Sequence, residues 1–166
     1  MAAWTSTPRT WTVGETVTAA NMNANIRDFA NGFGAWATYT PSLSGFTSVT
    51  ATTTGYYTQV QKTATVRCSV TINTVTTLGT SAITVGLPAN ASSTTGTDRF
   101  ICGIYRTNAG VYVPCGVTLT ASGGTFQTYT QTPGAANPNM SNWAGNAPAG
   151  QVAGDVWTWH FTYETT

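Results

Sequence analysis

The sequence predicts a mainly β protein: an antiparallel β-sandwich or jelly roll, preceded by an extended N-terminal arm and one short α-helix. Three observations support this prediction. Several segments after residue 46 alternate apolar and polar residues with a period of two, and turn residues separate them at short intervals. Residues 11–36 instead have the apolar spacing of a helix. We therefore divide the chain into an arm and anchoring helix, residues 1–36, and a β-domain, residues 37–166.

The clearest strand covers residues 63–73, because apolar residues alternate there with Thr, Arg and Ser. The alternating residues are Ala64, Val66, Cys68, Val70 and Ile72. Residues 55–61 are expected to form its partner strand. Residues 81–87, which Pro88 ends, form a third strand.

The second half of the β-domain continues this pattern. Phe100, Cys102 and Ile104 alternate in residues 99–106, and a turn at residues 107–110 leads to a strand within residues 110–122. Gly123 and Gly124 mark a further turn before residues 125–131. The last strand, residues 155–164, should be central in the sheet because it buries four aromatic side chains on one face. These are Trp157, Trp159, Phe161 and Tyr163.

The N-terminal segment carries large apolar residues spaced four, three, four and three apart. They are Met22, Ile26, Phe29, Phe33 and Trp36. On a helix they would form one narrow stripe, and a helix of about three to four turns needs a partner to be stable in water. The arm adds Trp4 and Trp11, which are expected to dock in a groove of the same subunit or of a neighbour. We expect these seven residues to form an oligomer or anchor interface; the alternative is a helix packed across its own β-domain.

Residues 132–154 form a long connection of Ala, Asn, Gly and Pro with no period. Met140, Asn142 and Trp143 make it a candidate ligand or partner loop, since an aromatic ring beside amides suits a sugar or a protein surface. A loop that Trp143 merely fastens to the domain is slightly favoured, because one Trp is a weak indication of glycan binding.

The composition excludes several function classes. Only 7% of residues are charged, whereas Thr makes up roughly a fifth. A hydrogen-bonding but nearly uncharged surface suits a protein packed against neighbours or exposed outside a cell. The net charge of +1, with arginines scattered singly, argues against nucleic acid as a partner. We expect no signal peptide, no membrane-spanning segment and three free thiols, with a Cys102–Cys115 bridge as the less favoured alternative.

The sequence predicts no catalytic residues, no cofactor and no metal site. His160 is the single histidine, and the cysteines lack the short pairing of zinc sites. A triad of Ser141, His160 and Asp155 could be drawn only on paper, since no serine lies in a GxSxG elbow. Glycosidase chemistry needs two facing carboxylates, and a pair contributed by two subunits stays open.

The segment TPRTWTVGETVTAANMNANIRDF resembles the N-terminal segment of small virion structural proteins of tailed bacteriophages that infect actinobacteria. The shared pattern W-x-x-G-E/D-x-x-T-A-x-x-x-N-x-x-x-R-D is carried by Trp11, Gly14, Glu15, Thr18, Ala19, Asn23, Arg27 and Asp28. Residues 39–46, 54–72 and 83–92 look like the β-domain that often follows. This chain lacks the GNGT run of that domain and has Gln61-Lys62 where its second Gly is expected.

The resemblance implies a non-enzymatic virion protein, minor tail or fibre-like, made in the host cytoplasm and displayed on the particle. It implies a homotrimer with the helix near the three-fold axis, attached to tail or major capsid proteins. One alternative is a capsid decoration protein that stabilises the head. A second alternative is a host-attachment protein that binds or degrades a cell-surface glycan.

Overall fold

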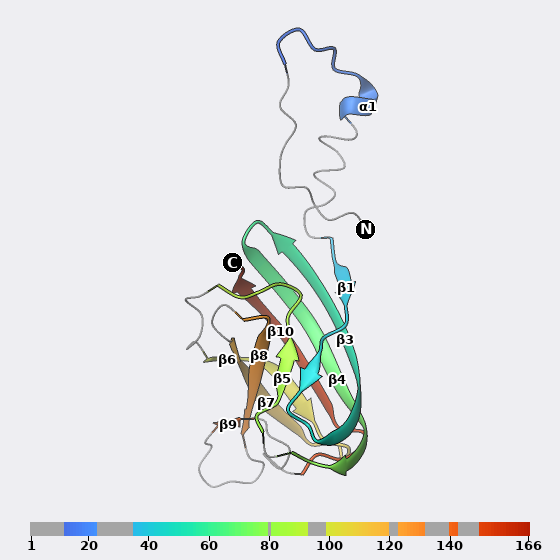
Figure 1. Ribbon diagram of the computed structural model, residues 1–166, viewed down its shortest axis with the longest axis vertical. Helices are drawn as coiled ribbons and strands as arrows, with labels where there is room; N and C mark the ends of the chain where they lie inside the picture. Colours follow the sequence, from blue (N-terminus) through green and yellow to red (C-terminus); the bar gives the residue numbers. More distant parts are fainter. Residues whose placement is uncertain are drawn as a thin grey trace.

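A computed structural model describes residues 12–22, 35–79, 81–92, 99–119, 123–131, 140–142 and 150–166. Apart from one helical turn, the elements in this part of the chain are β-strands (Figure 1). In chain order they are α1 (Ala19–Met22), β1 (Ala37–Tyr39), β2 (Leu43–Ser44), β3 (Ser48–Val60), β4 (Thr63–Thr77), β5 (Thr84–Gly86), β6 (Arg99–Arg106), β7 (Tyr112–Leu119), β8 (Thr125–Gln131), β9 (Met140–Asn142) and β10 (Val156–Glu164).

The ten strands form one antiparallel sheet in the order β1-β3-β4-β10-β6-β7-β8-β5-β2, with β9 beside β8. Strands β1 and β2 lie at opposite ends of this order, yet only residues 40–42 separate them. Such a short connection spans at most about 14 Å, so the sheet must curl until its two ends come close. Figure 1 shows this curl, with β3 and β4 on one side and β6, β7 and β8 on the other.

Contacts across the core confirm the curl. Phe126 on β8 packs edge-on against Trp159 and Phe161 of β10, with ring centroids 5.3 Å and 5.1 Å apart. The indole Nε1 of Trp159 donates a hydrogen bond of 2.9 Å to the hydroxyl of Thr128. Since β6 and β7 separate β8 from β10 within the sheet, these side chains meet by facing each other over the core.

Strand β10 is central, as predicted, because it pairs with β4 on one side and β6 on the other. Its four aromatic residues are buried, and Trp157 and Trp159 have no exposed surface. Neighbouring rings stack. The ring centroid of Tyr105 on β6 lies 4.2 Å from that of Trp157, and the ring centroids of Trp157 and Trp159 are 6.0 Å apart. Burying this much aromatic surface at about 25 cal/mol per Å² makes β10 a large contributor to core stability.

The predicted strands are largely confirmed. The five alternating apolar residues of β4 are at most 2% exposed. Strand β6 and strand β8 have the predicted bounds, and Gly110 adopts φ +82° in the predicted turn between β6 and β7. Strand β3 begins at Ser48, earlier than the predicted start at residue 55. The prediction missed its first half because this Thr-rich segment shows little hydrophobic alternation. Strand β5 is shorter than the predicted strand at residues 81–87.

The predicted alternation of β6 is wrong beyond Cys102. The pairing of β6 with β7 shifts register between Ile101 and Gly103, which leaves Cys102 as an extra residue. A bulge of this kind inverts the alternation of the residues that follow it. Ile104 is therefore 51% exposed on the outer face, while Tyr105 is buried.

Of the predicted helix of three to four turns, the described residues include one turn, α1, and the rest of that prediction lies outside them. The arm residues Trp4 and Trp11 and the stripe residues Ile26, Phe29 and Phe33 lie outside the described residues. In the part of the chain that the structure covers, no helix is long and apolar enough to cross a membrane.

The three cysteines, Cys68, Cys102 and Cys115, are free thiols, as predicted. Burial raises the pKa of each thiol from the ordinary value of 9.0 to about 12. The native state therefore keeps these protons over a pH range in which the unfolded chain releases them.

We predict that the three thiols make the free energy of unfolding fall as the pH rises from about 9 to about 12, whereas below pH 9 their contribution is constant. The free energy of unfolding falls because, above pH 9, the unfolded state binds fewer protons than the native state. Urea titrations across this range measure the fall. At pH 8 a thiol reagent should label Cys68 and Cys115 slowly in the native protein and all three thiols in the urea-denatured protein; fast labelling of Cys68 or Cys115 in the native protein would contradict their burial.

Candidate functional site

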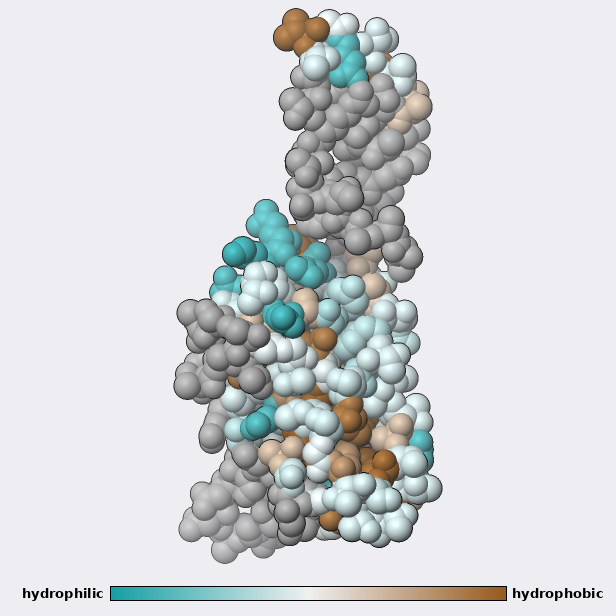
Figure 2. Space-filling model, viewed as in Figure 1, coloured by the Kyte–Doolittle hydropathy of each residue, from teal (hydrophilic) through white to brown (hydrophobic). Residues whose placement is uncertain are grey.

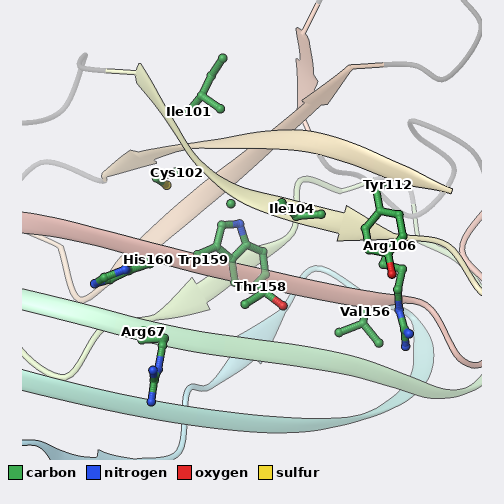
Figure 3. A pocket seen from close by; sticks show the side chains of 11 residues that line it. Arg67, Ile101, Cys102, Ile104, Arg106, Tyr112, Val156, Thr158, Trp159 and His160 are labelled. Carbon is green, nitrogen blue, oxygen red and sulfur yellow. The ribbon is translucent and has the colours of Figure 1, made fainter. Parts of the chain in front are cut away.

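The outer face of the sheet is hollowed where β4, β10, β6 and β7 lie side by side (Figure 3). Alternate residues of β10 fill the core, so the residues between them face outward. The hollow, which we call the outer groove, has a volume of about 690 Å³, within the range of ligand sites. Its lining residues are Arg67, Ile101, Cys102, Gly103, Ile104, Arg106, Tyr112, Val156, Thr158, Trp159 and His160.

One end of the outer groove is a row of cross-strand neighbours. Arg67 of β4 is paired with Tyr56 of β3 on one side and with His160 of β10 on the other. The Arg67 guanidinium carbon lies 5.4 Å from the ring centroid of Tyr56 and 5.7 Å from that of Trp36. Trp36 in turn lies 6.4 Å from the His160 ring. These cation–π contacts hold the Arg67 side chain in place although it is exposed.

The other end of the outer groove is apolar with one further cation. Ile104 and Tyr112 are 51% and 66% exposed there, whereas Ile101, which is 68% exposed, lies farther along β6, toward His160. Figure 3 shows Arg106 beside Tyr112, at the end opposite to Arg67 and His160. Large apolar side chains gathered on an outer sheet face are typical of a binding surface.

Gly103 brings β6 close to β10 below the groove. A Cβ at this position would collide with the Thr158 carbonyl oxygen and lie 2.8 Å from the Cys115 sulfur. The bulge at Cys102 places this glycine against β10, and the same bulge turns Ile104 outward. The depth of the groove therefore depends on one bulge and one glycine.

Hydroxyl pairs continue the same face over β3, β4 and β10. Thr54 and Ser69 are 2.8 Å apart, and Thr65 and Thr162 are 2.9 Å apart. In each pair one hydroxyl donates to the other, so a second hydroxyl hydrogen remains for another partner. Beside the outer groove the surface is thus rich in donors and acceptors without charge.

The lining of the outer groove contains two arginines and a histidine but no carboxylate. Asp155 precedes β10 but is 1% exposed. It accepts hydrogen bonds from the Tyr105 hydroxyl at 2.7 Å, from Asn108 N at 2.8 Å and from Val152 N at 3.0 Å. Burial and the hydrogen bond to Asp155 raise the pKa of the Tyr105 phenol above its ordinary value, so the phenol stays a donor. Asp155 fastens the β6–β7 turn to the start of β10 and is not available to a ligand.

Asp155, His160 and Glu164 do not come together as catalytic groups would. Asp155 is buried, whereas His160 lies on the outer face of β10. Asp155 and Glu164 lie at opposite ends of β10, about 30 Å apart, which is far beyond the separation in a glycosidase. Across the described residues no three His, Cys, Asp or Glu side chains converge as metal ligands would.

The structure places some of the predicted interface residues. Met22 is 42% exposed, and Trp36 is 41% exposed while it contacts Arg67 and His160 of its own chain. Met140 and Asn142 lie in β9, whose backbone pairs with β8. Trp143 lies outside the described residues. The predicted interface and the predicted ligand loop both stay predictions.

The sequence prediction missed the outer groove. Arg67 stands out as the one charged residue among the Thr and Ser of its strand face. Phe100 and Ile101 are two consecutive apolar residues, and such a break in alternation is the available sign of a bulge. Comparisons of this chain with protein-family models, curated proteins and solved structures found no match.

We predict that Asp155→Ala lowers the free energy of unfolding by about 2–4 kcal/mol, because three donors lose their acceptor. Tyr105→Phe removes one of these bonds and should cost about 1–2 kcal/mol. Urea denaturation followed by fluorescence measures both. Glu164→Gln is the matched control, with an expected change within about 0.5 kcal/mol. A smaller effect of Asp155→Ala than of Tyr105→Phe would contradict the role given to Asp155.

Proposed function

We propose that the protein is a non-enzymatic structural component of a bacteriophage virion, displayed on the particle and attached through its arm and helix. The observation that carries this proposal is that, among the residues the structure describes, the core is made by the β-domain. The buried core residues, and those packed against them, extend from Tyr39 to Tyr163. Val13, Val17 and Met22 in the described part of the N-terminal segment are exposed. These three described residues are therefore available for a partner.

We infer that the curled sheet is a sandwich or jelly roll and that α1 opens the longer helix that the apolar stripe predicts. The contact of Phe126 with Trp159 supports two facing layers. The first strand, β1, begins at Ala37, where the apolar stripe ends. In this arrangement three copies of the helix would meet through Ile26, Phe29 and Phe33, with the β-domains facing outward.

The surface supports display on a particle. The described cations are few, and Figure 2 shows a pale, weakly polar surface over much of the described β-domain, with strongly hydrophilic residues in a few places. Threonine hydroxyls replace charges on the outer strands. Such a surface can lie close to many identical neighbours without strong charge repulsion.

The minor tail or fibre-like placement competes with a capsid decoration protein, which would use the same arm, short helix and β-domain. Both differ from a glycan-degrading enzyme. In the described part of the chain, the buried position of Asp155 leaves no pair of facing carboxylates for such chemistry. The particle placement therefore needs a direct experiment.

We predict that gold-labelled antibody against this protein marks phage particles, at the tail. Label over the head would support the decoration alternative, and the protein should then raise the thermal resistance of mature capsids. Purified particles without label, in a preparation where an antibody against the major capsid protein gives strong label, would contradict the proposed function.

We predict that Phe29→Ser lowers the trimer fraction at least tenfold at micromolar concentration, because the stripe loses a central apolar side chain. Mass photometry of the full-length protein measures this fraction. Val17→Ser changes an exposed apolar residue outside the stripe and should leave the trimer intact. If the wild-type protein is monomeric both in solution and on phage particles, that result would contradict the proposed trimer.

A further inference from the structure

We propose that the outer groove binds an anionic glycan, meaning an oligosaccharide that carries carboxylate or phosphate groups. The groove is large enough for several sugar rings, at about 690 Å³. It lies on the face of β10 opposite to the core. A ligand could therefore bind there without opening the curled sheet.

The charges of the groove select an anion. Arg67 and Arg106 are its two arginines, and no carboxylate is among the described residues that line it. Arg67 is paired with His160, whereas Arg106 is paired with Val156 four residues earlier on β10. The backbone positions of the two arginines are thus about 13 Å apart along the strand direction, on opposite sides of β10. This spacing suits a chain with repeated negative groups better than one small anion.

The lining between the arginines suits sugar rings. Tyr112 exposes its ring, and Ile104 and Val156 provide an apolar floor for the C–H face of a pyranose. Thr158 places a hydroxyl within this floor, and Figure 3 shows its oxygen between Ile104 and Val156. At the other end Trp36 and Tyr56 flank Arg67. Aromatic faces, single hydroxyls and a held cation together match a polyhydroxylated anion.

Other occupants fit less well. A second copy of this chain would bring its own Arg67 and Arg106 to the same face, and like charges would oppose the contact. Single-stranded nucleic acid carries a phosphate on every nucleotide and is usually bound by a groove with more cations than this one. An acidic peptide shares the charge but not the need for hydroxyl partners beside the groove.

The inference deepens the proposed function, since its use in host attachment rests on display by a virion. Glycan binding by the purified protein does not depend on that display. If the protein is found on particles but binds no glycan, the groove proposal alone fails. If it binds glycan but is absent from particles, the virion proposal alone fails.

The test is calorimetric titration of the full-length protein with three probes. They are oligogalacturonate, which carries carboxylates, poly(glycerol phosphate), which carries phosphates, and neutral maltohexaose. We expect at least one anionic probe to bind at least tenfold more tightly than maltohexaose, with affinity that falls as salt rises. The better anionic probe identifies carboxylate or phosphate as the recognised group.

The variants Arg67→Gln and Arg106→Gln should each weaken binding of the anionic probe about tenfold, because each removes one charge-assisted contact. Lys62→Gln is the matched control, since it removes a cation in the β3–β4 turn, outside the groove. It should change the affinity less than twofold. Thermal melting of each variant verifies that the fold is retained.

Four binding results would overturn the proposal. They are an equal loss of affinity in Lys62→Gln, equal binding of maltohexaose, no binding of either anionic probe at millimolar concentration, and tighter binding of single-stranded DNA or a poly-glutamate peptide in the same groove. Self-association that the Arg67→Gln variant abolishes would also overturn it, in favour of an interface between copies.

Discussion

The burial of the β10 aromatic residues is the interaction on which the rest of the structure depends. Trp159 contacts Phe126 and Thr128 across the core, and Trp157 stacks on Tyr105 beside it. These contacts hold the two halves of one continuous sheet against each other. Because side chains alternate along a strand, the inward position of Trp157 and Trp159 also forces Thr158 and His160 outward. The core and the outer groove are two faces of the same strand.

The position of β10 explains why the groove has its particular chemistry. Its neighbour β4 contributes Arg67, and its other neighbour β6 contributes Ile104 and Arg106. Asp155, which directly precedes β10, is buried and accepts hydrogen bonds from three donors. The groove thus gathers two arginines, while the Asp155 carboxylate turns inward and Glu164, at the far end of the outer face of β10, lies outside the lining. This separation arises from strand alternation and requires no long-range electrostatics.

Much of the fold could be predicted from the sequence, because a period of two identifies a half-buried strand directly. The five core residues of β4 and the aromatic residues of β10 show this. The first half of β3 could not be predicted, since Thr suits both strand and loop and gives no alternation. The outer groove could not be predicted either. It depends on which strands become neighbours, and β10 pairs with β4 and β6 from distant parts of the chain.

The bulge at Cys102 has a consequence for how such a surface evolves. Deleting one residue there would restore regular pairing of β6 with β7, and the residues before the bulge would exchange faces relative to those after it. Related chains could then keep the same strands and core yet present different chemistry to a partner. The length of β6, as well as its composition, is therefore a heritable determinant of what the outer face can recognise.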